Sequence, residues 1–152
     1  MMQMDSLSDA LARASMNRSR LVFLSELLAD CNELECYKVL DMNRLLSERL
    51  INMPKHERAR AITTEVGALI NLIPESVVLI TGLEILFDCS LAVDPIRLLA
   101  TCAKNKTLMV LWPGFKTSSG LSYATPDHPE HRAYKASGLS DVVFLADNAH
   151  LY

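Results

Sequence analysis

One stretch of the chain decides its fold class: Val77-Val78-Leu79-Ile80, followed by Thr81-Gly82-Leu83-Glu84. Four consecutive apolar residues that end at a Thr-Gly turn are typical of a strand buried on both faces, as in a parallel sheet. Downstream, Asp94-Pro95 combines an N-cap residue with a proline in the first turn, which predicts the start of a helix. A second apolar run, Leu108–Trp112, predicts the next buried strand. This order predicts a right-handed βαβ unit.

Further strands are expected on both sides of this unit. Leu21–Leu24 and Val142–Leu145 are also continuous apolar runs, and Tyr37–Leu40 is expected to form a shorter strand. Segments with helical periodicity separate these runs, most clearly from Ala59 to Ile73. We therefore predict a single α/β domain over residues 1–152, with three layers and a mostly parallel sheet of about five strands.

Helices and one long loop are expected to connect the strands. Residues 1–19 are predicted to hold an N-terminal amphipathic helix, with Ser6 and Asp9 resembling a capping box. A short helix is expected at Ser25–Glu35, and Asn43 is expected to cap a helix that runs to Leu50. Residues 115–138 are rich in Ser, Thr, Pro and Gly and are expected to form a functional or mobile loop.

The chain lacks the phosphate-binding loop that such a sheet carries in P-loop proteins. That loop reads G-x-x-x-x-G-K followed by Ser or Thr, and its backbone N–H groups surround the phosphates. None of the five glycines begins such a pattern, and Leu21–Leu24 runs directly into Ser25-Glu26-Leu27-Leu28. Only residues 25–36 lead to the next strand, enough for a helix of about 18 Å but not for a phosphate loop as well. We predict a P-loop NTPase-like core without its Walker A loop.

Composition excludes several classes of protein. The chain is 50% hydrophobic and 22% charged with a net charge of −3, which is typical of a globular protein and gives no general electrostatic argument for nucleic-acid binding. No apolar run approaches the length of a membrane span, and the acidic N-terminus does not resemble a secretory signal, so a cytoplasmic location is expected. The cysteines at positions 31, 36, 89 and 102 form no C-x-x-C pair and are expected to be buried apolar side chains.

An ordered set of short motifs over roughly residues 37–134 resembles BrxF, the small P-loop-type component of type III BREX bacteriophage-exclusion systems. The set comprises Val39-Leu40-Asp41-Met42-Asn43, Leu46-Ser47-Glu48-Arg49-Leu50, Arg58-Ala59, Val77-Val78-Leu79-Ile80, Glu84-Ile85-Leu86-Phe87-Asp88, Asp94-Pro95-Ile96-Arg97-Leu98-Leu99, Lys104-Asn105-Lys106-Thr107, Trp112-Pro113-Gly114 and Leu121-Ser122-Tyr123-Ala124-x-Pro126-x-His128-Pro129-Glu130-x-Arg132. The resemblance implies other BREX components as partners, namely the large ATPase and the DNA methyltransferase. Self-association is also expected, since many P-loop relatives work as rings.

The chain departs from that family at the nucleotide site. Family members carry the phosphate loop, an acidic residue where this chain has Thr81, and an asparagine where it has Pro113. Glu84 is the nearest remaining carboxylate, and it could activate a water molecule or simply face solvent or cap the turn. We therefore expect a degenerate nucleotide site with no catalytic, cofactor or metal residues. The predicted function is a non-catalytic structural or regulatory subunit that acts by protein–protein assembly.

Candidate interface residues follow from side-chain type and from the motif. Arg97 could pair within its own chain or reach across a subunit interface, and Trp112 could be a core residue or an interface anchor. The motif adds Tyr123, His128 and Arg132. Asp127, His128, Glu130 and His131 are metal-ligand types, but without H-E-x-x-H spacing or an evident third distant ligand they favour a structural turn or partner contact.

Two alternative functions stay open at this point. One is a residual nucleotide-binding or ATPase subunit of the same system, which would show ATP-dependent thermal stabilisation. The other is a DNA-binding adaptor that uses the basic residues Lys55, Arg58 and Arg60, which would show salt-dependent binding to duplex DNA. The basic run could equally be a solvated helix face.

Overall fold

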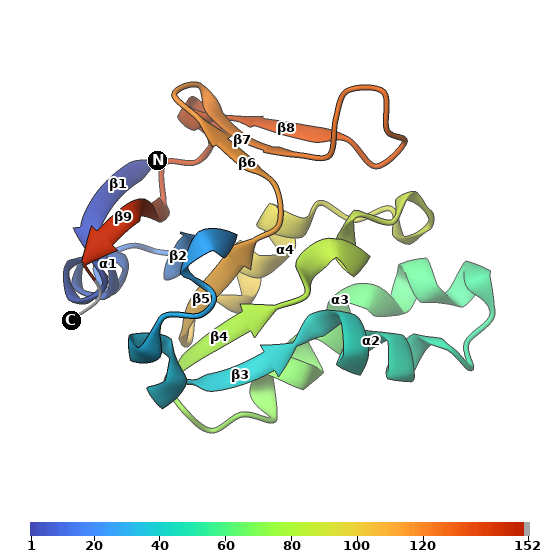
Figure 1. Cartoon of the computed structure of the whole chain (residues 1–152). Helices are drawn as coiled ribbons and strands as arrows, with labels where there is room; N and C mark the ends of the chain where they lie inside the picture. The colour runs from blue at the N-terminus through green and yellow to red at the C-terminus, as the bar shows by residue number, and fades with distance from the viewer. Residues whose placement is uncertain (151–152) are drawn as a thin grey trace.

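The computed structural model describes the backbone of residues 1–150 and the side chains up to Leu145. Its central feature is a six-stranded sheet in the order β1-β9-β2-β5-β4-β3, with every neighbouring pair parallel (Figure 1). The strands are β1 (Met2–Ser6), β2 (Leu21–Ser25), β3 (Lys38–Asp41), β4 (Val77–Thr81), β5 (Thr107–Trp112) and β9 (Val142–His150). The predicted α/β class with a mostly parallel sheet is confirmed, and the sheet has six strands.

The sixth strand is β1, which lies where only a helix was expected. It runs parallel to β9, with Met2 opposite Val143 and Met4 opposite Leu145. The predicted helix follows as α1 (Leu7–Ala14), and the Ser6 hydroxyl accepts a 3.1 Å hydrogen bond from the Asp9 backbone N–H. Because β1 is a short edge strand paired with the other end of the chain, its own sequence carries little sign of it.

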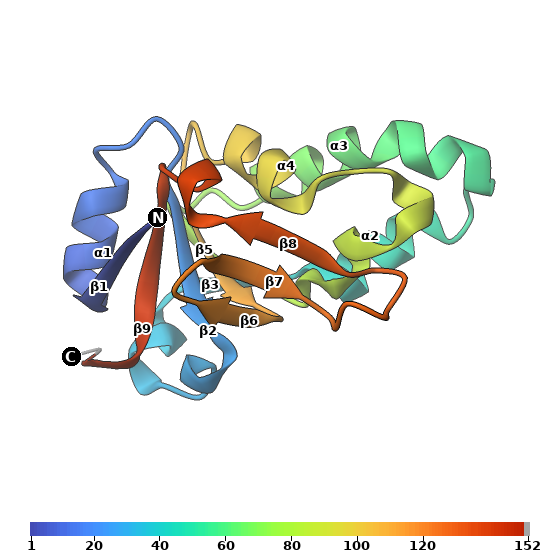
Figure 2. The same ribbon diagram turned by 90° about the horizontal axis from the view of Figure 1, so that it is seen from above.

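Helices cover the two faces of the sheet unequally. The helices α2 (Met42–Leu50), α3 (Lys55–Asn71) and α4 (Pro95–Cys102) pack against the face that carries Phe23, Ile80 and Val110. The opposite face carries Val22, Leu24 and Met109, and is covered by α1 and by residues 26–36. In Figure 2, α2, α3 and α4 lie together on one side and α1 lies apart from them. Within the described residues, no helix is both long and apolar enough to cross a membrane.

The prediction of a helix at Ser25–Glu35 is wrong. This segment forms two short 3-10 turns, Glu26–Leu28 and Asn32–Cys36. Leu28 and Leu34 are both buried against the sheet. Six residues on an α-helix turn through about 600°, which would place these side chains about 120° apart. An interrupted segment lets both side chains reach the same apolar face.

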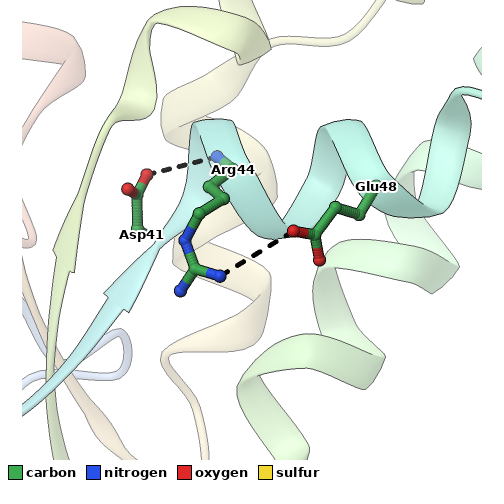
Figure 3. Close-up of polar contacts among 3 residues, drawn as sticks. All are labelled: Asp41, Arg44 and Glu48. Atoms are coloured by element: carbon green, nitrogen blue, oxygen red, sulfur yellow. Dashed lines mark hydrogen bonds and ion pairs between the residues drawn. The ribbon is translucent and has the colours of Figure 1, made fainter.

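The N-cap of α2 is Asp41 rather than the expected Asn43. Asp41 ends β3, and its carboxylate accepts a 3.2 Å hydrogen bond from the Arg44 backbone N–H (Figure 3). The exposed Arg44 side chain then lies 3.8 Å from Glu48 one turn later. Because the Asp41 carboxylate accepts from a backbone N–H at the N-terminus of α2, the side chain of Asn43 is free to make hydrogen bonds elsewhere.

The expected loop at residues 115–138 contains a second sheet. The strands β6 (Phe115–Thr117), β7 (Gly120–Tyr123) and β8 (Arg132–Lys135) form an antiparallel sheet that lies above the main sheet in Figure 1 and in front of it in Figure 2. These strands have only three or four residues each. They depend on contacts with the main domain, which local composition does not reveal.

The expectation of four buried cysteines is also wrong. Cys36 and Cys89 are exposed, Cys31 and Cys102 are half-buried, and all four are free thiols. The exposed thiols donate to backbone oxygens, Cys36 to Glu33 and Cys89 to Pro129, each at 3.2 Å. They lie on short surface turns rather than on an inward-facing helix.

Candidate functional site

The topology identifies one edge of the main sheet as the place to look for a binding site. The neighbouring strands β2 and β5 are followed by connections that run in opposite directions along the sheet. The chain passes from β2 to β3 at the far edge, and from β5 by way of the small sheet to β9 on the other side of β2. In open α/β sheets, ligands bind beyond the carboxyl ends of the strands at such a switch point. Ser25 ends β2 and lies beside Trp112, which ends β5.

A pocket of about 370 Å³ opens at this point, and we call it the carboxyl-edge pocket. Its lining includes the first residues after β2 and after β5, together with the buried side chains of Trp112 and Phe144. Two large apolar side chains of its lining face solvent, with Leu27 77% exposed and Phe115 59% exposed. The pocket therefore combines a packed aromatic interior with an exposed apolar rim.

Trp112 belongs to the core, which is one of the two alternatives that the sequence left open, and it is therefore not an exposed interface residue. Its side chain is 1% exposed and stacks on Phe23, with ring centroids 5.4 Å apart. The edges of Phe87 and Tyr134 complete its surroundings. Its indole N–H donates a 3.1 Å hydrogen bond to the carbonyl oxygen of Ser122. Trp112 thus joins the main sheet to β7.

Tyr123 packs next to Trp112 through the ring of Phe87. Its half-buried ring stacks on Phe87 at a centroid distance of 3.9 Å. Burial raises the pKa of Tyr123, and the charges of Glu130, Glu84 and Glu26 raise it further. Burial and the charge of Glu84 likewise raise the pKa of Glu26. We call Glu26, Glu84 and Glu130 the acidic rim.

Within the part of the chain whose side chains are described, no ion pair joins Glu26, Glu84 or Glu130 to a cationic side chain. The ion pairs there join Arg44 to Glu48, Arg49 to Glu65 and His56 to Glu57. The lysine that lines the pocket, Lys116, lies over the ring of Phe144 at 5.3 Å. The rim therefore presents negative charge toward solvent.

The predicted degenerate nucleotide site holds a structural clasp. Thr81 ends β4 opposite Asp41, and the next residue, Gly82, adopts a left-handed conformation. The amide of Asn43 donates a 2.7 Å hydrogen bond to the Glu84 carboxylate and accepts one of 2.8 Å from the Ile85 backbone N–H. Glu84 is thus half-buried and held by the Asn43 side chain, whereas the sequence offered a solvent-facing or turn-capping role, and Asn43 was expected only as a helix cap.

Pro113 lies in the tight connection between β5 and β6. A Cβ atom on the following residue, Gly114, would lie 1.9 Å from the carbonyl oxygen of Ser122. Only glycine permits this approach of the two backbones. Pro113 is therefore part of the joint between the two sheets.

The two candidate arginines do not line the carboxyl-edge pocket. Arg97 is exposed in the first turn of α4, and it lines a second pocket of about 330 Å³ near Leu21 and Val142, the first residues of β2 and β9. Arg132 donates a 2.8 Å hydrogen bond to the carbonyl oxygen of Val93. Arg132 therefore fastens β8 to the loop before α4.

The histidine-rich turn is held together by its own hydrogen bonds. The His128 ring accepts a 3.0 Å hydrogen bond from the Glu130 backbone N–H, and a hydrogen bond from Thr125 lowers the pKa of Asp127. His131 lies 3.2 Å from the carbonyl oxygen of Ala124. Among the described residues, no three His, Cys, Asp or Glu side chains are arranged to hold a metal ion.

The basic residues at the start of α3 are partly used within the fold. Arg58 donates hydrogen bonds to the carbonyl oxygens of Met53 at 3.0 Å and Ile51 at 3.3 Å. Hydrogen bonds from Ser90 lower the pKa of Asp88, and the charges of Lys55 and Arg58 add to this effect. The fold thus holds Arg58 in place, whereas Lys55 and Arg60 are exposed.

Comparisons of the chain with protein-family models, with curated proteins and with solved structures found no match.

Proposed function

We propose that this chain is a non-catalytic assembly subunit that binds a protein partner through the carboxyl edge of its sheet. The observation that carries the proposal is the exposed pair Leu27 and Phe115 at the switch point between β2 and β5. Aromatic and large apolar side chains at the mouth of a preformed pocket are typical of the centres of protein interfaces. Neither side chain is needed to fill the core, because most of its surface is open to solvent.

Local chemistry favours this function over residual nucleotide binding. The Ser25 hydroxyl accepts a 3.2 Å hydrogen bond from the Leu27 backbone N–H, which closes a 3-10 turn where a phosphate loop would be needed. Glu26 and Glu84 repel the phosphates of a nucleotide at the same edge. The lining holds a single lysine, Lys116, whose ammonium lies 5.3 Å from the centroid of the Phe144 ring.

The resemblance to BrxF extends the proposal to a BREX-like anti-phage defence system. In this view the chain keeps a P-loop-like core with a degenerate site and binds the large ATPase or the DNA methyltransferase of that system. Two residues of the resembling motif have structural roles in this chain, because Tyr123 stacks on Phe87 and Arg132 fastens β8. Self-association of the chain stays a prediction that the same experiments test.

Co-expression with those two components tests the proposal. The tagged chain is purified as wild type and as Leu27→Ser or Phe115→Ser, which remove apolar surface without adding charge. Leu72→Ser is the matched control, since Leu72 is 69% exposed at the end of α3 and does not line the pocket. We expect one of the components to co-purify with the wild type and the control but not with the two pocket variants.

Two results would overturn the proposal. The first is that neither component co-purifies with the wild-type chain. The second is that the pocket variants retain their partner as well as Leu72→Ser does. Unfolding curves of all variants show whether a loss of binding reflects a loss of folding. ATP-dependent stabilisation of the chain alone would favour the nucleotide-binding alternative, and salt-dependent binding of duplex DNA would favour the DNA adaptor.

A further inference from the structure

We infer that the second pocket, which Arg97 lines, binds a free apolar α-amino acid. This pocket has a volume of about 330 Å³ and is lined by α4, by the first residues of β2 and β9, and by residues 138–141, which lead into β9. We call it the α4 pocket. It shares no described lining residue with the carboxyl-edge pocket, so the inference does not depend on the proposed function.

The interior of the α4 pocket is apolar and small. Leu21 and Val142 lie opposite each other at the start of β2 and β9, and both side chains are buried. Ile96 from the first turn of α4 and Leu139 from the segment before β9 are buried beside them. The volume is at the lower end of the range for ligand pockets, which suits a small molecule with one apolar group.

A single cationic side chain lines the α4 pocket among the described residues, the exposed guanidinium of Arg97. The ion pairs in that part of the chain join other residues, and the hydrogen bonds of Arg97 come from its backbone. Its planar group of N–H donors therefore keeps its full capacity for a ligand. Since this geometry matches that of a carboxylate, Arg97 can hold the α-carboxylate of an amino acid.

Two carboxylates, Asp94 and Asp141, line the same pocket and can accept from the ammonium group of that amino acid. The Oδ1 atom of Asp94 accepts hydrogen bonds from the backbone N–H groups of Ile96 and Arg97 and from the hydroxyl of Tyr134 at 3.1 Å. Its Oδ2 atom takes part in none of these bonds. Because no buried side-chain oxygen within the described residues lacks a partner, Oδ2 is accessible to a ligand. Asp141 is exposed.

The mixed charge of the lining disfavours simpler ligands. A carboxylate without an ammonium group would lie near two carboxylates, and an amine without a carboxylate would lie near a guanidinium. The first N–H groups of α4 already donate to Asp94, so this helix terminus does not offer a phosphate site. A zwitterion with an apolar side chain fits the guanidinium, the carboxylates and the apolar interior together.

An NMR titration tests which parts of the ligand are recognised. The ¹⁵N-labelled chain is titrated with leucine and with compounds that each lack one part of it. Leucinamide lacks the carboxylate, isocaproate lacks the ammonium group, and free glycine lacks the apolar side chain. We expect leucine to bind most tightly and to shift the backbone N–H signals of Arg97, Ser140 and Asp141 but not those of Leu27 and Phe115. No saturable shift with millimolar leucine, or binding of any other compound as tight as that of leucine, would overturn the inference.

Charge variants assign the two ends of the ligand. Arg97→Gln removes the cation, and Arg60→Gln is the matched control, because Arg60 is also exposed on a helix and does not line the pocket. We expect Arg97→Gln to weaken the binding of leucine about tenfold and to leave the weaker binding of leucinamide unchanged. Asp141→Asn should weaken the binding of leucine and leucinamide but not that of isocaproate. The control should bind leucine as the wild type does.

The same variants separate this inference from the proposed function. Arg97→Gln lies outside the carboxyl-edge pocket and should leave the co-purified partner in place. Spectra without ligand show whether each variant is folded, and the wild-type titration decides the inference if one is not. If folded Arg97→Gln binds leucine as tightly as Arg60→Gln does, the inference fails, whatever the outcome for the partner.

Discussion

The side chain of Asn43 donates a 2.7 Å hydrogen bond to the carboxylate of Glu84, and this contact joins the first turn of α2 to the turn that follows β4. Because Asn43 also accepts a hydrogen bond from the Ile85 backbone N–H, one amide satisfies two groups at the carboxyl edge. Glu84 is therefore held in place by a side chain of α2. The same contact fixes one member of the acidic rim.

Replacement of Asn43 tests this clasp. We expect Asn43→Ala to lower the free energy of unfolding by about 1–3 kcal/mol, because both half-buried partners lose a hydrogen bond. Glu84→Gln keeps an oxygen that accepts from Asn43 and is expected to cost less. Urea unfolding measures both changes. An Asn43→Ala protein as stable as the wild type would show that the clasp contributes nothing.

The single tryptophan reports on the joint between the two sheets. Trp112 is buried among aromatic rings and donates to Ser122, so we expect blue-shifted emission and weak quenching by acrylamide. Trp112→Phe keeps an aromatic ring beside Phe23 but loses the hydrogen bond and some volume, and it should cost about 1–3 kcal/mol. Emission typical of an exposed indole would contradict the placement of β7 over Trp112.

Two glycines are expected to respond to alanine in opposite directions. Gly67 lies inside α3, and a Cβ atom added there would have no atom within 4 Å, so Gly67→Ala should stabilise the chain by about 0.5–1 kcal/mol. A Cβ atom at Gly114 would lie 1.9 Å from the Ser122 carbonyl oxygen, so Gly114→Ala should destabilise it by at least about 1 kcal/mol. Thermal unfolding compares the two, and equal shifts would contradict the close approach at Gly114.

The acidic rim should cost stability at neutral pH. Burial and Glu84 raise the pKa of Glu26 above its ordinary value of 4.5, so the folded state binds this proton more tightly than the unfolded chain does. Ionisation of Glu26 then opposes folding above its folded-state pKa, and the penalty disappears as the pH falls below 4.5. Since Glu26 is exposed, the effect is small and weakened by salt.

Glu26→Gln checks the sign of that penalty. We expect a slightly higher unfolding temperature than wild type at pH 7 in low salt, and no difference near pH 3. Glu35→Gln is the matched control, because Glu35 is an exposed carboxylate of the same segment that does not line the pocket. A lower unfolding temperature of Glu26→Gln at pH 7 would indicate a favourable partner for Glu26 within the chain.

The strands of the main sheet were the most predictable part of the structure. Leu21–Leu24, Val77–Ile80, Leu108–Trp112 and Val142–Leu145 all form strands, because continuous apolar runs of this length require burial on both faces. The start of α4 was equally clear from Asp94, whose carboxylate accepts hydrogen bonds from the helix N-terminus. These features are local, so their own sequence is enough to identify them.

The parts that depend on distant contacts could not be predicted. β1 pairs with β9 at the other end of the chain, and the small sheet relies on bonds such as that from Trp112 to Ser122. The same holds for the candidate site, where Asn43 meets Glu84 across 41 positions. The expected helix at Ser25–Glu35 is also a pair of short turns, and its apolar residues Leu28 and Leu34 pack on the main sheet.

Light scattering on the purified chain, mixed with the large ATPase or the DNA methyltransferase of a BREX-like system, tests the central claim most directly. We predict that the wild-type chain forms a complex with one of them and that Leu72→Ser does the same. The Leu27→Ser variant should show only the mass of the chain alone. The chain by itself should keep one mass with and without ATP and Mg²⁺. The account would be contradicted if the mass of the chain changed with nucleotide and either no complex formed or the complex survived Leu27→Ser. Such a result would mean that the carboxyl edge still binds phosphate and is not the protein-binding surface.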